Sequence, residues 1–251
     1  MRTRAGARSA VISSAVAPLA ARWKGVTLRA VLFDLDGTLL DTVDAIAAAL
    51  NLALAESLLA PLAVAQVREM IGRGAPLLIE RAVAQLGVPM DQAAQAVVLQ
   101  RYLQHYECIE AGAGHSARVY PGVRECLQQL HRQGLRLAVV TNKHKHLACG
   151  LLERLALSEW IDVLIGGDSC ARRKPDPQPL QVACEAMQVK PAEALMVGDS
   201  LNDVLAARAA GVAVVCVPYG YNEGNDPRAL ACDALVETLA ELPALLSAAS
   251  R

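Results

Sequence analysis

Five short apolar runs, each rich in β-branched residues, recur along this chain and set the strongest limit on its fold. They are AVLF (30–33), LRLAVV (135–140), DVLIG (162–166), ALMVG (194–198) and VAVVCV (212–217). None of them alternates between apolar and polar residues, which is the pattern of strands that are covered on both faces. We therefore expect a parallel sheet buried between layers of helices.

Helical segments connect these runs. VRECLQQLHRQG and LNDVLAARAAG have helical patterns, and each closes on a glycine, Gly134 or Gly211, that can end a helix. The repeated order of strand and helix predicts an α/β fold with a doubly wound, Rossmann-like parallel sheet. In such a sheet, ligands bind at the carboxyl ends of the strands.

One segment interrupts the alternation of strand and helix. In residues 44–118, Ala, Leu, Gln and Glu dominate and no strand pattern is visible, before RVYPGV (118–123) restarts the α/β rhythm. We predict a catalytic core made of residues 30–43 and 119–251. The α-helical cap domain, residues 44–118, is inserted after the first strand and joined to the core by two hinges.

The first 29 residues are basic, with six Lys or Arg and no acid, whereas the rest of the chain carries 18 basic against 25 acidic side chains. An acidic balance of this kind argues against nucleic acid as a partner. The apolar run SAVISSAVAPLAA resembles a secretory signal, but Ser13, Ser14 and Pro18 interrupt it. We expect residues 1–29 to be a disordered extension of a cytoplasmic protein.

The remaining composition excludes several classes of protein. No stretch reaches the roughly 18 to 20 continuous apolar residues of a membrane span, so we expect no membrane partner. The seven cysteines are scattered without a CxxC pair, which favours small buried hydrophobes in a reducing compartment. His144 and His146 have no further Cys or His at ligand spacing, so we interpret them as a solvated helix start rather than a zinc site.

Polar side chains follow the predicted strands, at the edge where ligands are expected. They are Asp34 and Asp36, then Thr141 and Asn142, then Asp168 with Lys174, and finally Asp199 with Asp203. Acids, one lysine and two small hydrogen-bonding side chains are what a divalent cation and a phosphate group together require.

Asp34 and Asp36 are the most informative of these residues. Extended backbone separates residues i and i+2 by about 6.6 to 6.8 Å and points both side chains to one side. Neighbouring carboxylates repel and raise one pKa unless a cation lies between them, and Mg²⁺ prefers such oxygen ligands. Gly37 and Thr38 then let the chain turn away.

The chemistry that these residues permit is phosphoryl transfer. Asp34 can attack phosphorus to form an aspartyl-phosphate, and Asp36 can protonate the leaving oxygen and later deprotonate a water. Thr141 and Asn142 offer a hydroxyl and backbone amides to phosphate oxygens. Lys174 can neutralise the nucleophile and the transferring group.

Asp199 and Asp203 repeat this logic at another strand end, four residues apart on one face if a helix begins there. Asp199 can contribute to the Mg²⁺ site, while Asp203 can orient Lys174 or a metal-bound water. We interpret Asp41 and Asp44 differently, as a capping pair at the start of the helix that leads into the cap.

DLDGT, VVTNK, RRKPDP and VGDSLNDVLAARAAG resemble, in order and spacing, the four motifs of haloacid dehalogenase-like phosphatases. The resemblance covers about residues 30–236 and implies Mg²⁺-dependent hydrolysis of phosphate esters under a cap that excludes water. It implies that Asp34 is the nucleophile and that Asp36 is the general acid/base. It also implies that Thr141 and Lys174 stabilise phosphate and charge, and that Asp199 and Asp203 form the acidic motif. Magnesium would be held by Asp34, the backbone carbonyl of Asp36, and Asp199.

IGRGAPLLIERA (71–82) and VPYGYNEG (217–224) resemble bacterial phosphoglycolate phosphatases. This resemblance implies 2-phosphoglycolate as substrate. We expect a monomer or homo-dimer whose partner is a small phosphorylated metabolite. The extension before Ala30 and the KHKH after the TN motif depart from the pattern. Arg73, a cation between two glycines of the cap, is our candidate for binding the substrate carboxylate, although an exposed turn fits it equally well.

Other functions stay open on the same residues. A hexose-phosphate mutase, a nucleotidase or a pyrophosphatase would use the same catalytic groups on another substrate. A non-enzymatic scaffold that accepts phosphate would use the acidic pocket for signalling, yet it would have little use for the insertion of residues 44–118. An intact but inactive pocket is the third alternative.

Overall fold

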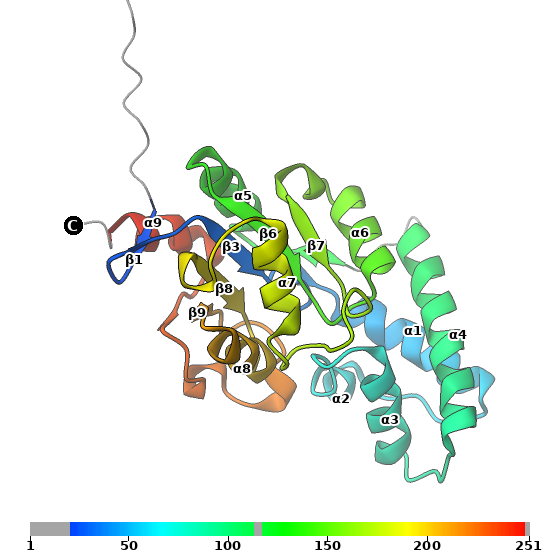
Figure 1. The fold of residues 1–251 in the computed structure, drawn as a ribbon. Coiled ribbons are helices and arrows are strands. Elements are labelled where there is room, and N and C mark those ends of the chain that lie inside the picture. Colours follow the sequence, from blue (N-terminus) through cyan, green and yellow to red (C-terminus); the bar gives the residue numbers. More distant parts are fainter. Residues whose placement is uncertain (1–20, 113–116, 249–251) are drawn as a thin grey trace, which may run out of the picture.

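The computed structural model describes residues 21–112 and 117–248, and its centre is a six-stranded parallel sheet (Figure 1). The strands are β3 (Ala30–Phe33), β6 (Arg136–Val140), β7 (Val163–Ile165), β8 (Ala194–Gly198), β9 (Ala213–Cys216) and β10 (Ala234–Leu235). Their spatial order is β10-β9-β8-β3-β6-β7, which is the 3-2-1-4-5-6 arrangement of a doubly wound fold. The five strands expected from the sequence are confirmed; β10 has two residues, too few to show a pattern.

Helices cover both faces of the sheet, so successive residues of one strand enter different hydrophobic clusters. Val31 and Phe33 face α5, α6 and α9, whereas Ala30 and Leu32 face α7 and α8. These helices are α5 (Val123–Arg132), α6 (Lys145–Arg154), α7 (Gln178–Ala186), α8 (Leu201–Ala210) and α9 (Leu242–Ala248). Burial on both sides is the reason why the strands read as continuous apolar runs.

The connections between these elements contain short 3-10 helices and glycine stops. The 3-10 helices are η1 (Ser158–Trp160), η2 (Pro191–Glu193), η3 (Asn222–Gly224), η4 (Pro227–Ala229) and η5 (Leu239–Glu241). Gly211 ends α8 with a left-handed φ of 74°, and Gly134 follows the last residues of α5 with a φ of 79°. Both predicted helix stops are confirmed, because glycine adopts this conformation without steric cost.

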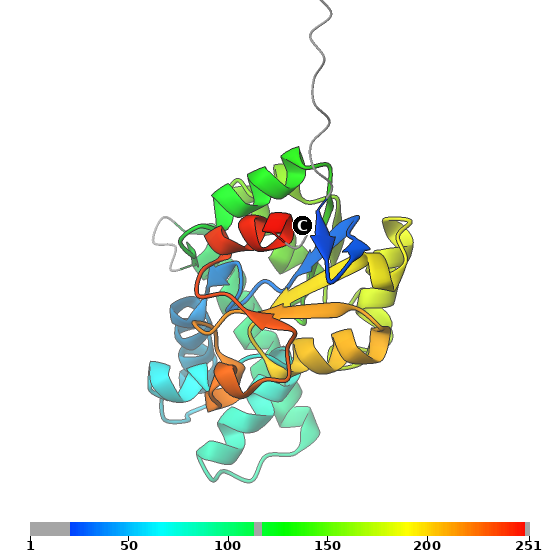
Figure 2. The same cartoon turned by 90° about the vertical axis from the view of Figure 1, so that its left-hand side faces the viewer.

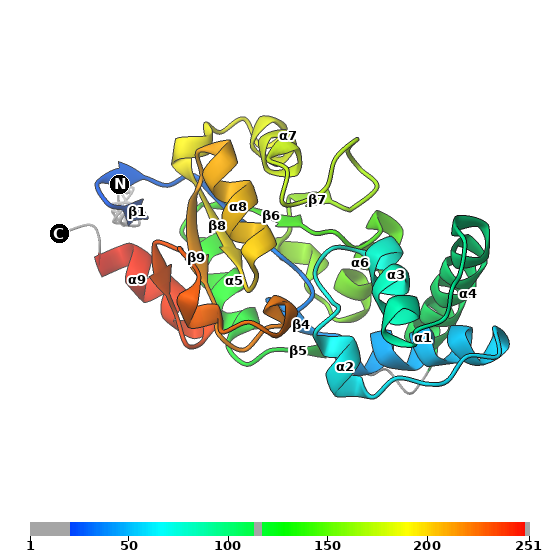
Figure 3. The same cartoon turned by 90° about the horizontal axis from the view of Figure 1, so that it is seen from below.

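Four helices form the cap beside the sheet (Figure 3). They are α1 (Val43–Glu56), α2 (Val64–Arg68), α3 (Ala75–Gln85) and α4 (Gln92–Ala111). They share a hydrophobic cluster with Leu147 of α6 and Tyr221 of the loop after β9, in which Leu50 and Leu54 of α1 and Tyr106 of α4 are fully buried. The predicted helical insertion thus has its own interior, separate from the two clusters that flank the sheet.

Two short strands mark the junction of core and cap. β4 (Leu40–Asp41) pairs antiparallel with β5 (Arg118–Val119), so that the chain enters and leaves the cap side by side (Figure 3). The prediction that Asp41 caps the next helix is wrong, because Asp41 lies in β4 and accepts a hydrogen bond from the Tyr221 hydroxyl. Asp44 does lie in the first turn of α1, where a carboxylate is favourable to the helix dipole.

The N-terminal segment is folded from residue 21 onward. β1 (Arg22–Trp23) and β2 (Val26–Thr27) form an antiparallel hairpin next to α9 (Figure 2). Trp23 and Leu28 are buried in the core cluster that includes α5 and α9. The predicted disordered extension is therefore wrong for residues 21–29, because these apolar side chains have a core to pack against; residues 1–20 lie outside the described residues.

The cysteines are all free, but the prediction that they are buried holds only in part. Cys126, Cys184 and Cys216 are buried, whereas Cys108 and Cys149 are exposed on helices. Separately, none of the helices in the described residues combines the length and the apolar character that a membrane crossing demands.

Candidate active site

Asp34 lies directly after β3, at the carboxyl edge of the sheet, and is buried. Its backbone amide donates to the Val197 carbonyl at 2.9 Å, which fixes it to the neighbouring strand β8. Its Oδ1 accepts a hydrogen bond from the Leu35 amide at 2.7 Å and lies 2.9 Å from Lys174 Nζ. The expected nucleophile thus has a defined position and a cation beside it.

Lys174 is buried in the turn before α7 and bridges two of the predicted acids. In addition to Asp34, its Nζ lies 2.7 Å from Asp203 Oδ1. Burial lowers the pKa of this lysine, but the carboxylates of Asp203 and Asp34 outweigh burial and raise its pKa above the ordinary value. Lys174 is therefore held as a cation against Asp34.

Asp199 and Asp203 come from the end of β8 and the first turn of α8. Asp199 accepts hydrogen bonds from Thr38 Oγ1 at 2.8 Å and from the Tyr221 amide at 2.7 Å. Oδ2 of Asp203 accepts from the Ser200 amide and hydroxyl. Oxygen atoms of Asp34, Asp199 and Asp203 all lie within 4.8 Å of one another, so three strand-end acids predicted from the sequence do meet.

Gly37 is what allows the DLDGT loop to approach Asp199 so closely. Its φ is +88°, and a Cβ at this position would collide with the Asp199 carboxylate. Gly220, in the loop after β9, lies against the same aspartate, and a Cβ there would collide with it too. Glycine at both positions is therefore a steric requirement of the acidic cluster.

The acidic cluster is short of positive charge. Burial raises the pKa of Asp34 to about 8, Lys174 offsets this only in part, and the carboxylates of Asp203 and Asp199 raise the pKa further. Burial, followed by the charge of Asp203, raises the pKa of Asp199 to about 7. Three carboxylates that share one ammonium suit a hard divalent cation with oxygen ligands, and Mg²⁺ fits this donor set.

Asp36 has partners of its own, apart from the cluster of three acids. It accepts a hydrogen bond from Thr42 Oγ1 at 2.7 Å, and Lys143 Nζ lies 3.1 and 3.2 Å from its two oxygens. The expectation that a strand pleat aims Asp34 and Asp36 to one side does not apply, because β3 ends at Phe33 and both lie in the loop beyond it.

Thr141 and Asn142 follow β6 and are both buried beside Asp34 and Asp36 in one cavity. The Nδ2 of Asn142 donates to the carbonyls of Gly72, in the cap, and of Lys174, each at 2.9 Å. Its side-chain amide therefore joins two loops rather than facing a phosphate. Thr141 Oγ1 accepts a hydrogen bond from the Lys143 amide at 3.2 Å.

The cavity at this edge has a volume of about 50 Å³ and is shared by core and cap. Its polar lining comes from the strand ends, and its apolar lining comes mostly from the cap, including Ile46, Ile71, Leu78, Tyr102 and Leu103. Because the cap side is apolar, it excludes water from the groups that carry the chemistry.

Arg73 is not among the residues that line this cavity. It is exposed and lies in a separate depression together with Pro175, Leu201 and Asn225. The neighbouring Gly72 and Gly74 both have positive φ, and a Cβ on Gly74 would come within 3.0 Å of the Asn142 carbonyl oxygen. The glycines let the cap loop reach the core, while the arginine between them lies outside the site.

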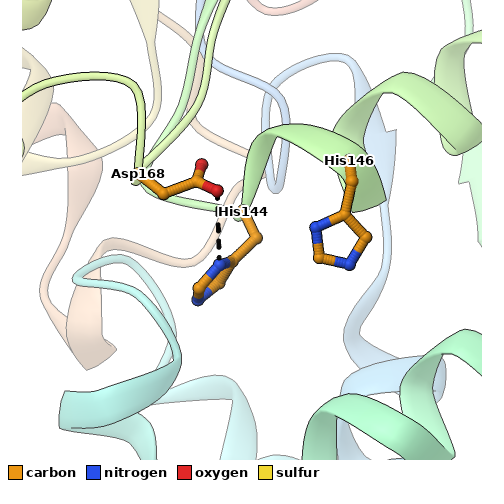
Figure 4. Close-up of side chains that lie close together, drawn as sticks. All are labelled: His144, His146 and Asp168. Atoms are coloured by element: carbon orange, nitrogen blue, oxygen red, sulfur yellow. Dashed lines mark ion pairs between the residues drawn. The ribbon is translucent and has the colours of Figure 1, made fainter.

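Asp168 does not join the other strand-end acids either, and Figure 4 shows it facing His144 instead. Its Oδ1 accepts a hydrogen bond from the Lys145 amide at 2.7 Å, and its Oδ2 lies 3.6 Å from His144 Nδ1. His144 is the residue before α6, and exposed His146 contacts Glu107 of the cap. The predicted helix start is confirmed; the positive end of α6, next to Lys145, is an unfavourable place for a cation.

Three residues of the site were not predicted from the sequence: Thr42, Lys143 and Tyr221. The Tyr221 hydroxyl donates to Asp41 Oδ1 at 2.8 Å and accepts from the Thr42 and Val43 amides. Tyr221 thereby holds the start of α1 from the loop after β9. Both the GYN segment, which contains Tyr221, and Lys143, directly after the TN motif, can be recognised in the sequence. Their roles follow only from the fold, which brings Lys143 to Asp36 and Tyr221 to Asp41.

A doubly wound sheet that carries acids and a lysine at the carboxyl ends of its strands, under a helical cap, defines a class of phosphate-ester hydrolases. Residues 31–217 match the family model described as haloacid dehalogenase-like hydrolase. The chain belongs to the haloacid dehalogenase-like hydrolase family, and it is a phosphoric monoester hydrolase.

The relatives carry more specific names. The chain is 44% identical to "Phosphoglycolate phosphatase" of Nitrosospira multiformis over 89% of this chain and 97% of that protein. It is 46% identical to "Phosphoglycolate phosphatase, plasmid" of Cupriavidus necator over 88% and 94%. Among solved structures, a predicted phosphoglycolate phosphatase of Haemophilus somnus has a TM-score of 0.81 at 31% identity, covering 87% of this chain and 97% of that one.

A second structural relative points to a different kind of ligand. A mutant of CbbY from Rhodobacter sphaeroides, in complex with xylulose-(1,5)bisphosphate, has a TM-score of 0.74 at 25% identity. The match covers 86% of this chain and 96% of that one.

Proposed function

We propose that this chain hydrolyses 2-phosphoglycolate to glycolate and phosphate, with Mg²⁺ as cofactor and an aspartyl-phosphate on Asp34 as intermediate. The observation that carries the proposal is the buried pairing of Asp34 with Lys174, at the wall of a small cavity shared with the cap. The names of the curated relatives support the substrate.

The reaction proceeds in two displacements at phosphorus. A carboxylate oxygen of Asp34 attacks phosphorus and forms the new P–O bond, while the bond to the glycolate oxygen breaks and Asp36 donates a proton to that oxygen. In the second step Asp36 takes a proton from water, whose oxygen attacks phosphorus. The bond between phosphorus and Asp34 then breaks, which releases phosphate and regenerates the carboxylate.

The other residues at the edge hold charge and position. Lys174 neutralises the nucleophile and the transferring group, and Asp203 keeps its ammonium in place. Thr141 and the backbone at Asn142 bind phosphate oxygens. Gly37 and Thr38 shape the loop around Asp199.

Magnesium fits the donor set described above. The residues that would hold it are Asp34, the backbone carbonyl of Asp36, and Asp199. When bound, the ion supplies positive charge to the phosphate oxygens and relieves the repulsion within the acidic cluster.

The size of the cavity favours a small leaving group. A volume of about 50 Å³ corresponds to room for about four water molecules. Because Asp34 lines the cavity, it must hold the phosphoryl group as well, and 2-phosphoglycolate, with nine heavy atoms against sixteen in a hexose monophosphate, requires the smaller enlargement. A sugar phosphate remains the second candidate, because CbbY was crystallised with a sugar bisphosphate.

We further propose that the protein works in the cytoplasm, in carbohydrate metabolism and the production of glycolate, as a monomer or homo-dimer. Its partner is a small phosphorylated metabolite, without nucleic acid or membrane. Supporting this, the chain after residue 29 carries 25 acidic against 18 basic side chains, a charge balance that would repel nucleic acid.

Phosphate release from a panel of esters tests the proposal. We expect kcat/KM for 2-phosphoglycolate to exceed that for nucleotides, pyrophosphate and glucose 1-phosphate with a trace of bisphosphate by about tenfold or more. EDTA should abolish turnover and Mg²⁺ should restore it. A preference for another ester would contradict the substrate, and undiminished turnover in EDTA would contradict the cofactor.

A further inference from the structure

Lys143 is a buried cation at the contact between core and cap. It follows the Thr141-Asn142 pair, and only 6% of its side chain is exposed. Its Nζ lies 3.1 and 3.2 Å from the two oxygens of Asp36 in the core. The same atom lies 4.3 Å from the centroid of the Tyr106 ring, on cap helix α4, in a cation–π contact.

The position of Lys143 assigns it to the leaving-group side of the site. Lys174, the other buried lysine, is confined to the side of the nucleophile by Asp34 and Asp203. Lys143 instead contacts Asp36, the acid that protonates the leaving oxygen under the proposed mechanism. Among the described residues, Lys143 is the only lysine or arginine that lines the cavity.

The cavity needs a cation at this place if the leaving group is an anion. Glycolate carries a carboxylate, and its transfer from water to a site walled by Ile71, Leu78 and other apolar side chains is costly without a partner. An ammonium has three donors, so contact with Asp36 leaves Lys143 with capacity for another acceptor. The Tyr106 ring covers the same ammonium and keeps water from competing.

We propose that Lys143 binds the carboxylate on the leaving group of the substrate and thereby selects acidic phosphate esters. This inference rests on the proposed function, and it places at Lys143 the role that the sequence suggested for Arg73. The contact with Asp36 then brings the proton donor and the leaving group to the same cation, which fixes their relative position.

A matched pair of substrates separates this role from a structural one. In 2-hydroxyethyl phosphate an alcohol replaces the carboxylate of 2-phosphoglycolate, and the ester bond is otherwise alike. In Lys143→Gln, kcat/KM for 2-phosphoglycolate should fall about 100-fold, chiefly through KM, because a desolvated charge pair is lost. For 2-hydroxyethyl phosphate the loss should be at least about tenfold smaller, because only the contact between Lys143 and Asp36 is then lost.

Two further variants serve as controls. Lys145→Gln removes the same charge from an exposed lysine two residues along the chain, and it should leave both values of kcat/KM within about twofold. Lys143→Arg keeps the positive charge and should retain most of the preference for 2-phosphoglycolate. If Lys143→Gln fails to fold, as judged by circular dichroism, the same pair of substrates is compared in Lys143→Met, whose apolar side chain suits a buried position and which should show the same selective loss.

The outcomes distinguish this inference from the proposed function. Equal losses on both substrates would overturn the inference and leave Lys143 as a residue that positions Asp36. If the wild-type enzyme itself shows no preference for 2-phosphoglycolate, the proposed function fails. The test of Lys143 then uses the ester that the enzyme does prefer among those with a carboxylate on the leaving group, together with the analogue in which an alcohol replaces that carboxylate. The inference still requires Lys143→Gln to lose activity selectively on the ester with the carboxylate.

Discussion

The acidic edge of the sheet and the cap above it differ in what holds their interiors together. At the edge, Asp34, Asp203 and Lys174 are buried charges joined to one another by ion pairs at 2.7 to 2.9 Å. In the cap, the interior is one apolar cluster around residues such as Leu50 and Ile79. The interior of the edge is stable only if every buried charge keeps its partner. The interior of the cap is stable because apolar side chains fill it without voids.

The difference follows from what each region does under the proposed function. A nucleophile, its cation and its metal ligands must stay at fixed distances, and directional hydrogen bonds provide such distances. A cover has to exclude water and fit the leaving group, which apolar packing achieves with few directional constraints. We therefore expect substitutions at the edge to act on chemistry and charge, and substitutions in the cap to act on stability.

The largest effect is expected at the edge. Asp34→Asn removes the nucleophile and should lower kcat by about 10⁴-fold or more, since no neighbouring group can replace the covalent step. The fold should survive, because the amide is isosteric and one of several repelling carboxylates is gone. Steady-state phosphate release and a thermal melt measure both effects; turnover within tenfold of wild type would remove the assignment of Asp34.

In the cap we expect the reverse pattern. Leu50 of α1 is fully buried, and Leu50→Ala should lower the free energy of unfolding by about 2 to 5 kcal/mol through lost contacts and a cavity. The matched control is Leu52→Ala on the same helix, where the side chain is 47% exposed and the cost should stay within about 0.5 kcal/mol. Equal costs in urea denaturation would show that the cap interior is not tightly packed.

The stability of the metal-free protein should depend on pH because of the edge. The pKa of Asp34 is raised to about 8 and that of Asp199 to about 7 in the folded state, both from 3.8. The folded state therefore keeps protons that the unfolded state releases. In EDTA, the free energy of unfolding should fall as pH rises from about 4 to about 8, by up to about 1.4 kcal/mol per pH unit for each of the two groups that stays protonated.

Magnesium should flatten this dependence, because it binds the ionised carboxylates of the folded state. Thermal melts at several pH values, with EDTA and with Mg²⁺, provide the comparison. Asp34→Asn in EDTA is the control for other titrating groups and should show a smaller slope than wild type. If the free energy of unfolding in EDTA rises with pH over this window, the pKa values of Asp34 and Asp199 are not raised in the folded state.

The smallest effect is expected at the outer rim, where core and cap meet in water. His146 of α6 and Glu107 of α4 lie 2.8 Å apart, but more than half of each side chain is exposed. His146→Ala should change the free energy of unfolding by no more than about 0.5 kcal/mol and kcat/KM by less than about twofold. A larger loss in either quantity would mean that the rim contributes to closure of the cap.

The sequence predicted the edge better than the cap contacts, and the reason is physical. Asp34, Thr141 and Asp199 each directly follow an apolar run, so the strand pattern alone places them at one edge of the sheet. Lys174 lies in a polar turn beyond β7, and only the resemblance of its motif singled it out. Lys143 and Tyr221 depend on contacts between segments that are far apart along the chain, and no local pattern encodes them. Arg73 shows the converse: a suggestive local pattern whose side chain the fold leaves outside the cavity.

The boundaries of the fold show the same division. The long strands can be predicted because burial on both faces requires a run of consecutive apolar residues. The two-residue strands β4, β5 and β10 are too short to show such a run. Asp41 resembles a helix cap in sequence, yet the Tyr221 hydroxyl uses it as an acceptor. Residues 21–29 were assigned to the basic extension. Their folding could not be predicted locally, because the core that buries Trp23 comes from distant parts of the chain.

Tyr221 connects the two regions through a single residue. Its backbone amide is bonded to Asp199, and its hydroxyl is bonded to Asp41 and to the first amides of α1, at the pivot of the cap. We expect a rotation of α1 at this point to displace Tyr221 and, through its backbone amide, the carboxylate of Asp199. The cover and the acidic edge thus share one tyrosine, and we expect the position of the cap to affect the geometry of the acidic cluster.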